Sequence, residues 1–202
     1  MKNRTKKERI IGVTGSFGTA KSYTVSIFRT LGCRVIDADK IGHGSLKKGT
    51  LTYKKIVKTF GRDVVKPDGS IDRRSLGKII FNNDRKRSQL NSILHPVIVK
   101  KIRSEISCMK GTRPVVLDAA LLFEAGCEKL VDKIVVVRSS RKTQIGRVIK
   151  KFGFSKDDAL RRIKSQMPLN EKIRRADFVI SNDGPRSSTK RQVREVWRKL
   201  WK

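Results

Sequence analysis

The stretch that decides the fold is Ile10-Ile11-Gly12-Val13-Thr14-Gly15-Ser16-Phe17-Gly18-Thr19-Ala20-Lys21-Ser22, a short apolar run followed by a glycine-rich segment. Beyond it, Val25, Phe28 and Leu31 recur at helical spacing. This order predicts a strand, a tight loop and a helix. Because such a loop turns backbone N–H groups and the positive end of the helix toward an anion, phosphate binding is the first expectation.

The loop is close to the P-loop pattern of nucleotide-binding proteins. In that pattern backbone amides cradle the phosphates, a lysine reaches the β- and γ-phosphates, and the next hydroxyl binds magnesium. Gly15, Lys21 and Ser22 have the required offsets. A glycine-rich turn that only joins a strand to a helix is the alternative, and the three fixed positions favour phosphate binding. We expect the phosphates on Gly15, Ser16, Phe17, Gly18, Thr19, Ala20, Lys21 and Ser22, with Ser22 as the metal ligand.

Ala20 departs from this pattern, which has glycine directly before the lysine. If the backbone has a positive φ at this position, a Cβ there costs about 1–2 kcal/mol and crowds the phosphate. Nucleotide binding is then expected to be weaker than with glycine.

The rest of the chain alternates between strand and helix patterns. Apolar runs of strand character follow at residues 35–36, 114–117, 133–137 and 177–180. Residues 42–113 show helical periodicity without a clear strand, and a basic, mostly helical stretch at 139–175 contains Gly153 as a breaker. A terminal helix is expected from about residue 187. This alternation predicts an α/β sheet protein.

Composition excludes several classes of protein. The chain has 202 residues, of which 37% are hydrophobic, so it is expected to be globular rather than disordered. No apolar run approaches the roughly 18 residues of a membrane span, and the apolar segment after the basic start is too short for a signal peptide. The three cysteines lie far apart in sequence, which suggests neither a disulfide framework nor a zinc site. A reducing, cytoplasmic location is expected.

The charge is strongly positive. Lys and Arg total 49 against 18 Asp and Glu, a formal net charge of +31. This balance favours polyanionic partners such as nucleic acid, nucleotides or anionic lipid, without choosing among them. The basic residues are spread along the chain, which also suits an ordinary solvated surface.

Two carboxylates follow the second predicted strand, in the order Asp37-Ala38-Asp39. The carboxyl edge of a parallel sheet faces the crevice in which such folds bind ligands. A carboxylate there either takes the proton of an attacking hydroxyl or holds the metal. Capping of the next helix is the structural alternative, and spacing does not separate these roles.

Further motifs follow in order from about Ile10 to Gly184, and together the chain resembles the dephospho-coenzyme A kinase family. They are Val35-Ile36-Asp37-Ala38-Asp39, Gly69-Ser70-Ile71-Asp72-Arg73, Ile93-Leu94-His95-Pro96, Leu121-Leu122-Phe123-Glu124, Gln144-x-x-Arg147, Ser165-Gln166-Met167, Lys172 and Ala176-Asp177.

The resemblance implies a P-loop kinase fold with a five-stranded parallel core, a helical substrate-binding insertion and a helical lid, all in a single kinase domain over residues 1–202. The nucleotide-binding core is expected at residues 9–42, 113–138 and 176–202. The acceptor-substrate region is expected at 43–112 and the lid at 139–175.

The resemblance also implies the reaction, which is transfer of the ATP γ-phosphoryl group to the ribose 3′-hydroxyl of dephospho-coenzyme A with Mg²⁺. Asp39 is the expected catalytic base, and Lys21 and Arg147 are the expected catalytic cations. The acceptor is expected on Thr14, Asp39, His95, Pro96, Leu121, Leu122 and Glu124, and the nucleotide also on Tyr23, Asn182 and Gly184.

Several of these residues have structural alternatives. His95 before Pro96 is also consistent with a helix end, because proline disfavours a helical conformation in the preceding residue. Leu121 and Leu122 suit core packing, and capping of the next segment suits Asp118, which is not counted as catalytic. Arginine in the family pattern is replaced by Lys151.

Three other departures bear on the catalytic rate. Tyr23 replaces a small hydroxyl residue, Ala120 replaces a proline, and Phe152 replaces an acidic residue of the family pattern. Two other functions are alternatives to this kinase. One is a weakened P-loop protein whose basic surface binds RNA or another polyanion, and the other is a kinase of the same fold for another small nucleotide. The ordered motifs beyond the P-loop favour a kinase of dephospho-coenzyme A.

Overall fold

The central sheet has five parallel strands in the order β2-β3-β1-β4-β5. The computed structural model describes residues 10–109 and 113–201. The strands are β1 (Ile10–Gly15), β2 (Arg34–Asp37), β3 (Val115–Asp118), β4 (Lys133–Arg138) and β5 (Phe178–Ser181). The predicted α/β class and the five-stranded parallel core are confirmed.

The helices fill the remaining segments. They are α1 (Lys21–Thr30), α2 (Ala38–Ser45), α3 (Leu51–Phe60), η1 (Arg62–Val64), α4 (Arg73–Phe81), α5 (Asp84–Cys108), η2 (Cys127–Leu130), α6 (Arg141–Phe152), α7 (Lys156–Lys164), α8 (Leu169–Arg174) and α9 (Arg186–Trp201). Among the described residues, none of these helices combines the length and the apolarity needed to cross a membrane.

The chain divides into two compact units. The sheet unit comprises Met1–Asp37 and Cys108–Lys202, and the helical unit comprises Ala38–Ser107. The division falls between Asp37, the last residue of β2, and Ala38, the first residue of α2. Asp39 therefore belongs to the helical unit, although only Ala38 separates it from the last residue of β2.

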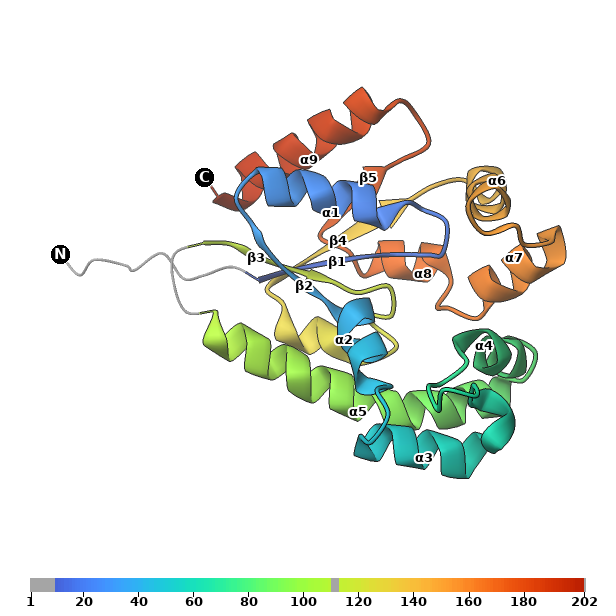
Figure 1. Cartoon of the computed structure of the whole chain (residues 1–202). Helices are drawn as coiled ribbons and strands as arrows, with labels where there is room; N and C mark the ends of the chain where they lie inside the picture. Colours follow the sequence, from blue (N-terminus) through green and yellow to red (C-terminus); the bar gives the residue numbers. More distant parts are fainter. Residues whose placement is uncertain (1–9, 110–112, 202) are drawn as a thin grey trace. The chain divides into compact units, whose positions relative to one another are not determined.

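Apolar side chains of the sheet unit form a core under α1 and α9. These two helices pack side by side on one face of the sheet, and α8 lies against β4 on the other face (Figure 1). Phe28 of α1 and Val193 of α9 are fully buried together with Val13 and Val135 of the strands. Burial on both faces explains the nearly continuous apolar runs of the central strands.

The helical unit has a small core of its own, made by Ile56, Val64, Ile71, Leu76 and Leu90. Its one described β contact is an antiparallel bridge between Val65 and Ile71, close to a turn at Gly69. The predicted absence of a regular strand in this part of the chain is confirmed.

The alternative that His95 ends a helix before Pro96 is wrong. Helix α5 has 25 residues and contains Pro96 in its interior. Proline removes one helical hydrogen bond and crowds the preceding turn. Leu90 and Ile102, on either side of the proline, are both buried, so packing on both halves holds the helix together.

Candidate active site

The P-loop (residues 15–22) runs from the end of β1 into α1, in the middle of the sheet. Gly15 pairs in register with Val137 of β4, and a Cβ on Gly15 would lie 2.6 Å from the Val137 carbonyl oxygen. Gly18 has a φ of +86°, and a Cβ there would lie 2.7 Å from the Gln144 carbonyl oxygen. Only glycine lets the loop backbone approach β4 and α6 this closely.

Ala20 adopts the left-handed conformation, with φ 57° and ψ 41°. It is the one residue other than glycine with a positive φ in the described part of the chain. The positive φ that the sequence analysis considered for Ala20 is therefore present, and Ala20 has the strain of an L-residue in this conformation. Its carbonyl accepts a hydrogen bond from the Tyr23 N–H at 3.0 Å.

Side chains from distant segments hold the P-loop from outside. The Asn182 side chain is 4% exposed, and its Nδ2 donates to the Thr19 carbonyl at 2.8 Å. The Gln166 Oε1 accepts a hydrogen bond from the Phe17 N–H at 2.8 Å. The loop is therefore shaped by residues more than a hundred positions away in sequence.

Arg147 of α6 contacts the same loop. Its Nη2 donates to the Asn182 carbonyl at 2.7 Å, and its Nη1 donates to the Ser139 Oγ at 3.1 Å and to the Thr19 carbonyl at 3.5 Å. The guanidinium thus ties α6 to the P-loop and to the end of β5. A planar group with five donors can hold these acceptors and still present an N–H to a phosphate.

Lys21 forms an ion pair with Asp118, and both side chains are 11% exposed. Asp118 is the last residue of β3, and it is the register partner of Asp37 on β2. We did not count Asp118 as a catalytic residue from the sequence. The sequence feature that could have identified Asp118 is its position at the carboxyl end of an apolar strand, where a carboxylate reaches the ligand-binding edge of the sheet.

Glu124, the last residue of the Leu121–Glu124 motif, lies in an internal polar network. Lys172 is fully buried, and its Nζ lies 3.0 Å from Glu124 and donates to the Ala120 carbonyl at 2.7 Å. The Ala120 carbonyl also accepts from the Thr14 Oγ1 at 3.2 Å. Burial lowers the pKa of the Lys172 ammonium, and the Glu124 carboxylate opposes that shift.

The remaining site candidates of the sheet unit are divided between core and surface. Leu122 is fully buried, close to Gly12, whereas Leu121 is half-buried. Ser22 is exposed in the first turn of α1, and the Tyr23 hydroxyl donates to the Arg186 carbonyl at 3.3 Å. Gly184 is exposed, with open space where a Cβ would lie.

The other three candidates belong to the helical unit. Asp39 is exposed in the first turn of α2, where a carboxylate faces the positive end of the helix. His95 is half-buried and Pro96 is exposed, both within α5.

Comparison with known proteins identifies the family. Residues 9–187 match the family model described as dephospho-CoA kinase. A protein from Carboxydothermus hydrogenoformans named dephospho-CoA kinase is 45% identical over 195 residues, covering 96% of this chain and 94% of that protein. The chain belongs to the dephospho-CoA kinase family.

Solved structures agree with this membership. A structure titled "Crystal structure of TT1252 from Thermus thermophilus" is 27% identical, has a TM-score of 0.81, and covers 96% of this chain and 98% of that one. A dephospho-CoA kinase from Campylobacter jejuni is 29% identical, has a TM-score of 0.69, and covers 95% and 96% of the two chains.

Phe152 has a structural role beside the P-loop. Its ring stacks on Phe17 at the tip of the P-loop, with ring centroids 5.4 Å apart, and on Phe154 at the same spacing. The Arg162 guanidinium lies over Phe154 at 4.2 Å. In this chain, aromatic contacts thus join the P-loop to α6 and α7.

The residues around the P-loop are suited to magnesium. Among the described residues, no group of three or more His, Cys, Asp and Glu side chains gathers as a metal cluster. Mg²⁺ in kinases needs few protein ligands, because phosphate oxygens and water complete its shell. The exposed Ser22 hydroxyl and the Asp118 carboxylate are oxygen groups of the kind that would hold the ion in this arrangement.

Replacing Ala20 by glycine is expected to stabilise the protein. The change removes the cost of a left-handed alanine, and the greater freedom of glycine in the unfolded chain cancels part of that gain. The free energy of unfolding should rise by about 0.5–1 kcal/mol, measured by denaturant titration, and the KM for ATP should not rise. Ala176→Gly, at a residue without a positive φ, is the control, and a loss of stability in Ala20→Gly would contradict the strain.

Replacing Glu124 by glutamine is expected to destabilise the sheet unit. The variant keeps an acceptor for the Met167 N–H, which Glu124 binds at 2.8 Å, but leaves the fully buried Lys172 ammonium without a counter-charge. Removing one partner of a buried pair costs about 3 kcal/mol or more. Asp84→Asn, which removes the exposed partner of Arg87, should leave the denaturant midpoint nearly unchanged, and equal midpoints for both variants would contradict the role of the pair.

Proposed function

We propose that the protein transfers the γ-phosphoryl group of ATP to the ribose 3′-hydroxyl of dephospho-CoA and releases CoA and ADP. The main support for this proposal is the match of residues 9–187 to the dephospho-CoA kinase family. The P-loop with Lys21 at its end provides the chemistry, because phosphoryl transfer depends mainly on positioning and on neutralising charge.

Lys21 acts on the donor. Its ammonium is close to Asp118, and the arrival of a triphosphate gives it stronger acceptors, the β- and γ-phosphate oxygens. Lys21 then exchanges Asp118 for phosphate, which frees the Asp118 carboxylate. Asp118 and Ser22 would hold Mg²⁺, which would supply charge neutralisation at the donor phosphates.

Asp39 acts on the acceptor. Its exposed carboxylate accepts the proton of the 3′-hydroxyl as that oxygen forms its bond to the γ-phosphorus. The bond from the γ-phosphorus to the bridging oxygen breaks, and ADP leaves with its electron pair. We assign the acceptor to residues 43–112, including His95 and Pro96, and to Leu121 of the sheet unit. Thr14 and Leu122 are fully buried, and Glu124 is engaged by Lys172 and by the Met167 N–H, so these three residues act by positioning.

We assign the lid to residues 139–175, with Arg147 as its phosphate-facing cation. The loop after β5 borders the adenine. Both backbone groups of Asn182 are already used, because its N–H donates to the Arg138 carbonyl at 2.9 Å and its carbonyl accepts from Arg147. Asn182 therefore positions the P-loop, and the backbone near Gly184 contacts the base.

The reaction is proposed to take place in the cytoplasm. ATP is available there, and the three cysteines, Cys33, Cys108 and Cys127, are free thiols, as suits a reducing compartment. Burial raises the pKa of the Cys33 thiol to about 12, which keeps it protonated and unreactive at neutral pH.

Non-specific binding of polyanions remains a prediction from the net charge of +31. The exposed face of α9 carries Arg186, Lys190, Arg194 and Arg198 at intervals of four residues. Any such binding is expected to weaken steeply as salt is added, because each phosphate contact releases counterions. RNA retention at physiological salt without a phosphorylated product would support the polyanion-binding alternative instead.

Removal of the Asp39 carboxylate tests the proposed reaction. Asp39→Asn should lower kcat by roughly 10²-fold or more, since a general base contributes about 10²–10⁴-fold, and should leave the KM for ATP nearly unchanged. Chromatography of the 3′-phosphorylated product measures the rate. Asp63→Asn, an exposed carboxylate of the same unit, is the control; an unchanged kcat in Asp39→Asn would exclude Asp39 as the base.

A further inference from the structure

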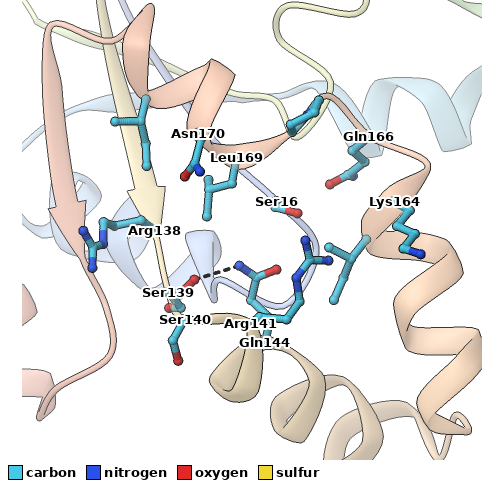
Figure 2. A pocket seen from close by; sticks show the side chains of 13 residues that line it. Ser16, Arg138, Ser139, Ser140, Arg141, Gln144, Lys164, Gln166, Leu169 and Asn170 are labelled. Carbon is cyan, nitrogen blue, oxygen red and sulfur yellow. Dashed lines mark hydrogen bonds between the residues drawn. The ribbon is translucent and has the colours of Figure 1, made fainter.

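A pocket of about 490 Å³ opens beside the P-loop within the sheet unit. We call it the Gln144 pocket. Its wall is built by Ser16 of the P-loop, by the junction of β4 and α6, and by the segment from the end of α7 through α8 (Figure 2). Its volume is in the range of sites for organic ligands and is far larger than a single phosphate requires.

The pocket attracts anions. Arg138, Arg141 and Lys164 are among its lining residues, and no lining residue is acidic. Figure 2 shows Arg138 and Lys164 on opposite sides of the space, with Arg141 and Gln144 between them at its base. A ligand with phosphate groups is therefore expected at its rim.

Gln144 places a specific demand on the ligand. Its side chain is 2% exposed, and its Oε1 has no hydrogen-bond partner among the described residues. Its Nε2 donates to the Ser139 carbonyl at 2.8 Å (Figure 2), so exchanging the two amide atoms would set two oxygens against each other. A buried acceptor without a partner is costly, so a ligand that supplies an N–H or O–H donor is favoured.

Apolar side chains complete the wall. Ile163, Leu169 and Ile173 line the pocket beside the polar groups. The ligand that suits this wall has phosphates, a neighbouring hydrogen-bond donor and a short apolar portion. A triphosphate chain meets only the first of these conditions, because its oxygens are acceptors at neutral pH.

We propose that the Gln144 pocket binds the phosphopantetheine arm of dephospho-CoA. The arm carries a hydroxyl and two amide N–H groups as donors for the Gln144 Oε1, a dimethyl group for the apolar wall, and an adjoining diphosphate for the cationic rim. This inference rests on the proposed function, which provides the acceptor. It adds that Gln144 and Arg141 select the arm, at a distance from the reacting ribose hydroxyl.

Steady-state kinetics with two acceptors tests this role. Gln144→Leu and Arg141→Ala should each raise the KM for dephospho-CoA by roughly three- to tenfold, as the loss of one hydrogen bond implies. The KM for ATP and kcat should change less than about twofold. With 5′-AMP, which has the 3′-hydroxyl and lacks the arm, the Gln144→Leu variant should match the wild type. Lys142→Ala, an exposed neighbour on α6 outside the pocket lining, is the control.

Calorimetry with 4′-phosphopantetheine tests the pocket independently of catalysis. The wild type and Lys142→Ala should bind this compound, and Gln144→Leu and Arg141→Ala should bind it at least threefold more weakly, with denaturant midpoints verifying that each variant is folded. Equal binding by all four proteins, or a raised KM for ATP in place of dephospho-CoA, would overturn the assignment. A wild type that binds the arm but forms no product would contradict the proposed function and leave the pocket assignment standing.

Discussion

The hydrogen bonds to the carbonyl oxygen of Thr19 hold the P-loop in its conformation. This oxygen accepts hydrogen bonds from the buried Asn182 amide at 2.8 Å and from Arg147 at 3.5 Å, side chains that come from the end of β5 and from α6. With its carbonyls held from outside, the loop can direct N–H groups toward a ligand. Ala20 is kept in a left-handed conformation by the same surroundings.

A second group of contacts fixes the opposite side of the loop. Lys172, Glu124, Thr14 and the Ala120 carbonyl form one connected network, and Gln166, one residue before Met167, accepts from the Phe17 N–H. Because Glu124 also binds the Met167 N–H, the segment between α7 and α8 is tied to both the loop and the sheet. These motif residues therefore contribute by positioning, which is what phosphoryl transfer requires of a protein.

The net charge of +31 has a smaller part in the site than its size suggests. Lys21 and Lys172 are each paired with a carboxylate close to the P-loop, whereas most other cations among the described residues are exposed. Three more cations, Arg138, Arg141 and Lys164, line the Gln144 pocket, where we propose that they bind a phosphorylated substrate. The cations of α9 lie outside both groups.

The sequence by itself determined the five strands, the helical insertion and the P-loop, because apolar periodicity and the offsets of Gly15, Lys21 and Ser22 are local properties of the chain. From the sequence we predicted what a positive φ at Ala20 would cost, but not that the φ of Ala20 is positive, because that angle depends on contacts from distant residues. The sequence did not select Asp118, and it did not foresee that α5 continues through Pro96. The tertiary structure alone decided the pairing of Lys21 with Asp118, because that pair depends on how segments about a hundred residues apart pack together. It also decided that the Gln144 Oε1 is buried without a partner in the described part of the chain, because neighbouring helices exclude other polar groups from it.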